Sequence, residues 1–238
     1  MAQTTKRTGL TKALAAGLSA VFLLLCGCAR APVPGEAAAP TSSGAVQTDV
    51  PAADKTDGTE LLPGVIVSGP YPFSGRFVED GSDEEVEDIA AVRLTNTGGE
   101  DYQYLEFTVV TQTASYAFAA SSVHAGTAMT VLNKEKLPCR EGETAVAAEC
   151  PVHAGYQTPP SMLGDMFELK QATGSFSIRN VTGEDLAGTI TVYYKCTDEN
   201  GWFGGITFRT VLNGLAAGQE QWMPAEHMGR VVFVTYEE

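Results

Sequence analysis

The sequence predicts an all-β protein that contains two copies of one module, and three observations support this. The segments after residue 62 are rich in Val, Ile, Thr, Tyr and Phe, which favour strands, and Gly and Pro interrupt them. No long stretch repeats apolar residues at helical spacing. The motif Asn-x-x-Gly-Glu-Asp occurs twice, at residues 96–101 and 180–185.

The repeat extends beyond this motif. Each copy lies between a short apolar segment and a longer segment of strand-forming residues. Further along, residues 125–131 match residues 217–223, and both segments begin with Ala-Gly. Three matches in the same order predict two tandem β modules, which we expect over residues 63–135 and 166–238.

The N-terminus has the pattern of a secretory signal peptide. Lys6, Arg7 and Lys12 form a basic segment, and residues 13–25 form an apolar segment that is too short to span a bilayer comfortably. This apolar segment ends in Leu-Cys-Gly-Cys at residues 25–28. The pattern therefore predicts export from the cytoplasm.

The Leu-x-Gly-Cys ending resembles the lipobox of bacterial lipoproteins. In that family the peptide is cut before the Cys, whose sulfur then carries acyl chains such as palmitate. Cys28 fits better than Cys26, because Cys28 has Gly27 before it and Leu25 three residues back. The resemblance implies a signal peptide over residues 1–27, lipidation of Cys28, and a location on the extracytoplasmic face of the cell membrane.

The charge balance argues against two classes of partner. The chain has 15 basic and 29 acidic residues, and without residues 1–27 the balance is 12 against 29, a formal charge of −17. Nucleic acid and anionic lipid surfaces both require clustered Lys and Arg. We therefore expect the acyl chains on Cys28 to make the membrane attachment. Residues 28–62, rich in Ala, Pro, Ser and Thr, are predicted to be the lipidated Cys and a disordered linker.

The densest charge feature is the acidic segment of residues 79–88. Asp80, Asp83 and Glu85 are weak candidates for calcium ligands, although their spacing does not follow the twelve-residue calcium loop. The alternative is a solvated loop whose like charges repel one another. We predict no cofactor.

Residues 136–165 are the predicted connector between the modules. Cys139 and Cys150 enclose ten residues, and outside the cytoplasm a disulfide would stabilise so short a loop by about 3 kcal/mol. Adding His153 gives at most three zinc ligands, where structural zinc sites have four. We therefore predict a disulfide between Cys139 and Cys150.

The second module contains the clearest hairpin. Residues 189–196 alternate, residues 198–201 turn with an Asn-Gly pair, and residues 205–212 return. On this register Cys196 belongs to the apolar face, where a buried thiol is inert, and Lys195 lies on the opposite face. Trp202 and Phe203 follow the turn. These two rings either bind a sugar or a partner side chain, or fold back over the end of the module.

The number and spacing of short strands in each module resemble an immunoglobulin-like β-sandwich. Such sandwiches have filled interiors, so binding sites are expected at loop ends or at the module junction. The sequence contains neither a Gly-x-Ser-x-Gly elbow nor a glycine-rich phosphate loop. We therefore expect a non-catalytic surface lipoprotein that contacts another envelope protein or the cell wall. The alternative is a ligand-binding lipoprotein that serves a transporter or an envelope enzyme complex.

Overall fold

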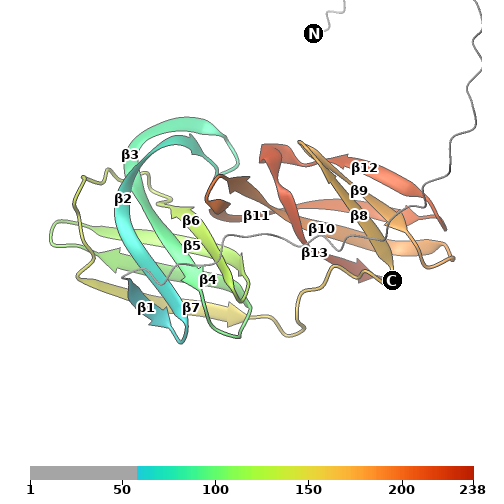
Figure 1. Ribbon diagram of the computed structural model, residues 1–238, viewed down its shortest axis with the longest axis horizontal. Coiled ribbons are helices and arrows are strands. Elements are labelled where there is room, and N and C mark those ends of the chain that lie inside the picture. Colours follow the sequence, from blue (N-terminus) through green and yellow to red (C-terminus); the bar gives the residue numbers. More distant parts are fainter. Residues whose placement is uncertain (1–57) are drawn as a thin grey trace, which may run out of the picture. The chain divides into compact units, whose positions relative to one another are not determined.

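The computed structural model describes residues 58–238, and this part of the chain is all-β, as predicted (Figure 1). The signal peptide, Cys28 and most of the predicted linker lie outside the described residues. The described helical structure is one short 3₁₀ turn, Glu226–Met228. None of the described helices is long and apolar enough to cross a membrane. The strands are β1 (Thr59–Leu62), β2 (Val65–Phe77), β3 (Glu84–Asn96), β4 (Tyr102–Val110), β5 (Ser115–Val123), β6 (Thr127–Leu132), β7 (Ala147–Gly155), β8 (Phe167–Ala172), β9 (Ser175–Asn180), β10 (Leu186–Asp198), β11 (Gly201–Leu215), β12 (Glu220–Pro224) and β13 (Arg230–Glu237).

The strands form three sheets. One has seven strands in the order β1-β2-β3-β6-β11-β10-β13, and the others have three strands each, β5-β4-β7 and β12-β9-β8. The large sheet crosses from the N-terminal to the C-terminal half through a short parallel pairing, in which Met129 and Thr130 of β6 face Trp202 and Phe203 of β11. Both halves therefore share one sheet.

Each half of the large sheet packs on its own small sheet. In the first module, Val92 of β3 and Leu105 of β4 belong to the core between β1-β2-β3-β6 and β5-β4-β7. In the second module, Ile178 of β9 and Val192 of β10 belong to the core between β11-β10-β13 and β12-β9-β8. Strands β2 to β7 thus correspond in order to β8 to β13.

The contacts of the first Asn-x-x-Gly-Glu-Asp motif explain why its residues recur. Asn96 is fully buried, and its side-chain amide donates to the carbonyls of Glu100 at 2.8 Å and Val123 at 3.2 Å. The Asp101 carboxylate accepts a hydrogen bond from the backbone N–H of Ala125 at 2.8 Å. The motif therefore ties the start of β4 to the end of β5.

The second motif makes the same contacts. The buried Asn180 amide donates to the carbonyls of Glu184 at 2.7 Å and Leu215 at 2.9 Å. The Asp185 carboxylate accepts from the N–H of Ala217 at 2.8 Å. The two copies of the motif therefore make equivalent hydrogen bonds in the two halves of the described chain.

The boundaries of the first module differ from those predicted. Strand β1 lies in the segment predicted as disordered linker, and it pairs with β2. Strand β7 lies in the predicted connector, and it pairs with β4 along most of its length. Most residues of β7 are exposed because it is an edge strand, so its sequence carries no clear apolar alternation. The connector is therefore shorter than predicted and begins after Gly155.

Two long hairpins build the junction between the modules. Strands β2 and β3 have 13 residues each and β10 and β11 have 13 and 15, whereas their counterparts β8, β9, β4 and β5 have only 6 to 9. The β2–β3 hairpin curves over the first module, and the tip of the β10–β11 hairpin reaches β6 (Figure 1). Phe203 and Cys196 from this tip pack with Phe77 and Val78 in a third apolar cluster.

The tip of the β10–β11 hairpin turns where the sequence predicts. Asp198 pairs with Gly201, so the loop residues are Glu199 and Asn200. Within the predicted Asn-Gly pair, Gly201 has a positive φ of 114°. The Asn200 N–H donates to the Asp198 carboxylate at 2.7 Å, which holds the turn without an Asn residue in the left-handed conformation.

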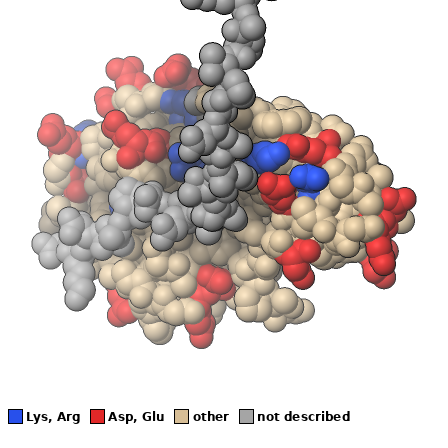
Figure 2. Space-filling view, turned by 45° about the vertical axis from the view of Figure 1, so that its right-hand side comes forward, with Lys and Arg blue, Asp and Glu red and all other residues tan. Residues whose placement is uncertain are grey.

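Acidic side chains are spread over the face of the molecule drawn in Figure 2, and basic side chains are few. This distribution agrees with the formal charge of −14 for the whole chain. A charge of this size opposes the approach of other anions.

Candidate functional site

A groove of about 660 Å³ lies where the two modules meet. Tyr104 of β4 and Ser121 of β5 line it from the first module, whereas Tyr193 of β10 and Phe233 of β13 line it from the second. The connector, at residues 156–163, closes one side. Tyr104 and the adjacent core residue Leu105 lie on opposite faces of β4. The walls of the groove are therefore the outer faces of two sheets, which point away from the cores.

Packed aromatic rings form the second-module side of the groove. Tyr193 and Phe233 stack with their ring centroids 4.2 Å apart and an interplanar angle of 12°. Tyr156 from the connector meets Phe233 edge-on at 5.7 Å, and the imidazole of His124 stacks on Tyr156 at 5.9 Å. These mutual contacts fix the ring positions before any ligand arrives.

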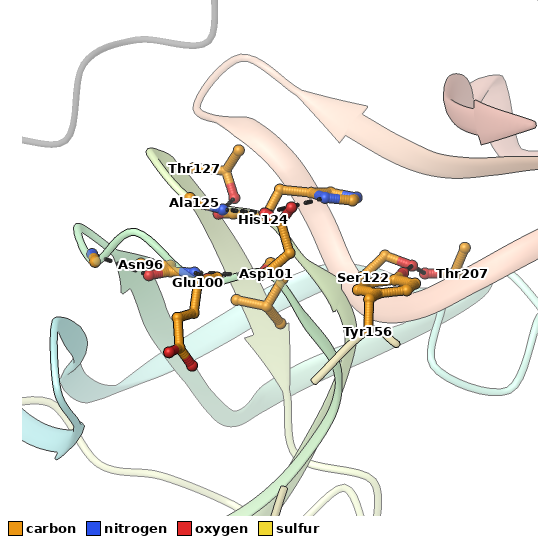
Figure 3. Close-up of polar contacts among 11 residues, drawn as sticks. Asn96, Glu100, Asp101, Ser122, His124, Ala125, Thr127, Tyr156 and Thr207 are labelled. Atoms are coloured by element: carbon orange, nitrogen blue, oxygen red, sulfur yellow. Dashed lines mark hydrogen bonds and ion pairs between the residues drawn. The ribbon is translucent and has the colours of Figure 1, made fainter. Parts of the chain in front are cut away.

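A chain of hydroxyl groups crosses the groove floor (Figure 3). Thr207 donates to the Ser122 hydroxyl at 3.1 Å. The Ser121 hydroxyl oxygen lies 2.8 Å from that of Thr207 and 3.0 Å from the carbonyl oxygen of Gly205. Tyr156 also donates to Ser122, at 3.0 Å. Ser122 is 4 % exposed and has a φ of 52°, in the left-handed region that non-glycine residues rarely adopt. Backbone strain of this kind is often found at functional sites.

The fully buried Lys195 lies beneath this floor. Its ammonium group donates to the carbonyls of Ser121 at 3.0 Å, Gly205 at 3.1 Å and Ile206 at 3.0 Å, and to the Thr207 hydroxyl at 3.4 Å. Burial lowers the pKa of Lys195 to about 8. Lys195 therefore ties β10 and β11 of the second module to β5 of the first.

Glu79 binds the backbone N–H of Gly205 on β11, the residue whose carbonyl Lys195 binds. Its carboxylate accepts from the N–H of Gly205 at 2.8 Å and from that of Leu132 at 2.9 Å. Burial raises the pKa of Glu79, while these hydrogen bonds and the Lys195 charge oppose that increase. A Cβ at Gly205 would lie 2.0 Å from the carbonyl oxygen of Ala119, so only glycine allows this approach.

His124 forms a pair with Asp101 at the end of the groove floor. The His124 Nδ1 atom lies 3.5 Å from the Asp101 carboxylate (Figure 3). Burial lowers the pKa of His124, so the imidazole is neutral at neutral pH. Its Nε2 atom is buried and has no hydrogen-bond partner within residues 58–238. This histidine is therefore not paired with a serine, threonine or cysteine nucleophile in the described part of the chain.

The structure buries the aromatic pair that was the predicted binding candidate. Trp202 is 6 % exposed and belongs to the first-module core, and Phe203 is 4 % exposed in the third apolar cluster. The packing alternative is therefore the correct one, and neither ring presents a surface to a ligand. The rings pack against the first module rather than over the end of their own, because the long hairpin carries them across the junction.

The predicted disulfide is wrong for this structure, because Cys139 and Cys150 are free thiols. The N–H of Cys139 bonds to the carbonyl of Asp88 on β3, whereas Cys150 lies on β7 and so belongs to the opposite sheet. The loop between them crosses from one sheet to the other, and both cysteines contact the core of the first module. Burial raises the pKa of both thiols. Cys196 is also free and buried, as expected for a core residue.

The weak calcium candidates do not converge on one point. Asp80 pairs with Lys136 at 3.4 Å, and Asp83 pairs with His227 at 2.5 Å. Glu85 is an exposed residue of β3. Within residues 58–238 no group of three or more His, Cys, Asp or Glu side chains could hold a metal ion. Asp80 and Asp83 instead bind basic partners on other segments, which the calcium hypothesis did not anticipate.

A scan against protein-family models, a search of curated proteins and a search of solved structures each gave no match for this chain. The function must therefore be argued from the groove itself. The sequence predicts the module junction as a possible site but predicts none of the residues that line the groove. They come from several strands and the connector, and no local motif joins them.

Proposed function

We propose that this protein is a non-catalytic, membrane-anchored surface protein of a bacterial cell that binds an envelope component in its junction groove. One observation carries the proposal: the groove lining contains no charged side chain, although the chain has a formal charge of −14. Preformed grooves with aromatic walls and a few placed polar groups are typical binding sites.

The proposed anchor is the lipid on Cys28, which rests on the resemblance of residues 25–28 to a lipobox. Cys28→Ala should abolish metabolic labelling with a palmitate analogue and release the chain from the membrane fraction. Cys26→Ala is the matched control and should leave labelling unchanged. Labelling that persists in Cys28→Ala and disappears in Cys26→Ala would move the anchor to Cys26.

The absence of catalysis is also a proposal, supported by the polar groups near the groove. The hydroxyl chain ends at Ser122 with no base bonded to it, and the neutral His124 has no hydroxyl partner among the described residues. General-base activation of a nucleophile requires such a bond. A panel of ester, peptide and glycan substrates should show no turnover. Turnover that disappears in His124→Gln would contradict the proposal.

A second candidate function is the capture of a diffusible ligand for a transporter or an envelope enzyme complex. The groove volume of about 660 Å³ favours it as well, because it falls within the range of small-molecule sites. The two functions differ in where the ligand resides. A fixed envelope component sediments with isolated cell envelopes, whereas a diffusible ligand remains in the soluble extract.

Retention of the purified full chain on isolated cell envelopes tests the main proposal. Tyr193→Leu removes one ring from the groove wall and should lower retention at least tenfold. Trp222→Leu removes an aromatic ring that is 51 % exposed on β12, outside the groove, and should leave retention unchanged. Equal retention of the wild type and Tyr193→Leu would refute binding in this groove.

A further inference from the structure

We infer that the ligand of the junction groove is an uncharged oligosaccharide of about two or three sugar rings, a size that suits a groove of this volume. This inference rests on the proposed function and names the ligand class of the same site. It depends on three features of the groove: its charge, its rings, and the direction of its hydrogen bonds.

The absence of charged side chains from the groove lining disfavours anionic ligands. The nearest cation beneath the floor is Lys195, which is 0 % exposed and directs its ammonium hydrogens at three carbonyls and the Thr207 hydroxyl. An anion in the groove would find no accessible counter-charge and would meet the field of a chain with a formal charge of −14. A cation would find no carboxylate among the lining residues.

The rings and hydroxyls suit the two kinds of surface on a sugar. Tyr156 and Tyr193 offer aromatic surface for the C–H groups of a pyranose, whose positive edges favour the electron-rich ring face. Thr158, Ser161 and Thr235 lie around these rings and carry hydroxyls that both donate and accept. Sugar hydroxyls have the same dual capacity.

The hydrogen bonds of the floor run in one direction. The Lys195 ammonium can only donate, so Thr207 accepts from it and donates onward to Ser122. Ser122 also accepts from Tyr156, so its oxygen is the acceptor in both of these hydrogen bonds. Ser122 lines the groove, so its hydroxyl proton is available to a ligand oxygen. Lys195 is thus a positioning residue that orients the Ser122 donor.

A proline-rich peptide is the strongest competing ligand, since aromatic grooves also bind such segments. A peptide would use the rings and one donor for its carbonyls, and would leave the surrounding threonine and serine hydroxyls without partners. An oligosaccharide engages both the aromatic rings and the surrounding hydroxyl groups. The observations therefore favour the sugar.

Titration calorimetry on the full chain in detergent micelles tests the inference. The neutral probes are maltotriose, chitotriose, mannotriose and galactotriose, and the comparators are sialyllactose and a proline-rich decapeptide. At least one neutral trisaccharide should bind at least tenfold more tightly than either comparator. Ser122→Ala should weaken that binding about threefold to tenfold, the value of one hydrogen bond. Ser115→Ala, an exposed position on the same strand and outside the groove, should not change it.

If Tyr193→Leu fails to fold, a second variant that fills the groove with a large side chain tests binding in its place. Thr235→Trp should abolish both saccharide binding and envelope retention. If every neutral trisaccharide fails to bind, or if the peptide or sialyllactose binds most tightly, the inference is wrong. If the groove variants lose envelope retention but no trisaccharide competes for it, only the ligand class is wrong. If the groove variants retain full envelope binding, the proposed function fails as well.

Discussion

At the scale of single residues, the repeat preserves two buried asparagines and the hydrogen bonds of their side-chain amides. Asn96 and Asn180 each place an amide between two carbonyls of separate segments. Asn96→Ala and Asn180→Ala should each cost about 2–3 kcal/mol, because each leaves buried carbonyls unsatisfied. Asn213→Ala, at an exposed position, should cost less than about 0.5 kcal/mol. Urea denaturation measures all three, and a clear inequality between the two buried sites would contradict their equivalence.

Lys195 holds the junction through hydrogen bonds to both modules. Lys195→Met keeps the side-chain volume but leaves the carbonyls of Ser121, Gly205 and Ile206 without their donor. It should lower the free energy of unfolding at pH 7 by about 3 kcal/mol. The double variant with Glu79→Gln should be less destabilised than additivity predicts, because no unpaired buried charge remains. Full additivity would mean that the two charges are independent.

The lowered pKa of Lys195 gives a pH dependence with a definite sign. The folded protein loses this proton near pH 8, whereas the unfolded chain keeps it until about pH 10.4. Between these values unfolding takes up a proton, so raising the pH stabilises the folded state by up to about 1.4 kcal/mol per pH unit. The buried thiols have raised pKa values and act in the opposite direction. The difference in stability between wild type and Lys195→Met should therefore grow from pH 8 to pH 9.5. A difference in stability that stays constant over this pH range would contradict the lowered pKa of Lys195.

At the scale of strands, the close approach of β11 to β5 depends on one glycine. A side chain at Gly205 would meet the backbone carbonyl of Ala119, which cannot move without breaking its own strand. Gly205→Ala should cost about 2–3 kcal/mol through overpacking. Gly99→Ala is the matched control, since nothing lies within 4 Å of a Cβ there and neither glycine requires a positive φ. Thermal unfolding distinguishes the two, and similar melting temperatures would contradict the junction geometry.

The elements that the sequence predicted correctly are those whose signals are local. The repeated motif, the alternation over residues 190–194 and the turn before Gly201 all involve neighbours in the chain. The predicted alternation does not extend to Cys196, because register shifts after Tyr193 and Tyr194 interrupt it. The free thiols of Cys139 and Cys150 were not predictable from their spacing, because the loop between them connects opposite sheets. The edge strand β7 was missed because most of its residues are exposed. The groove was missed because its residues come from several strands and the connector.

At the scale of the whole molecule, the long hairpins couple two modules that share one strand order. Trp202 comes from the second module but belongs to the first-module core, so unfolding either module disrupts the other. Calorimetry of the wild type should therefore show one cooperative transition. Trp202→Ala should cost about 3–5 kcal/mol and separate or broaden the transition. Trp222→Ala removes an exposed tryptophan and should have little effect. Two transitions in the wild type would contradict the coupling.

The proposed function depends on this coupling, because the groove walls belong to different modules and keep their shape only while the junction holds. The direct test is site-specific photo-crosslinking in living cells that carry the full chain. A crosslinking amino acid replaces either Thr158, which is exposed on the groove rim, or Val211, which is 50 % exposed outside the groove. We expect the Thr158 position to capture envelope material and the Val211 position to capture none. Equal capture from both positions, or capture from Val211 alone, would contradict the assignment of the groove as the binding site.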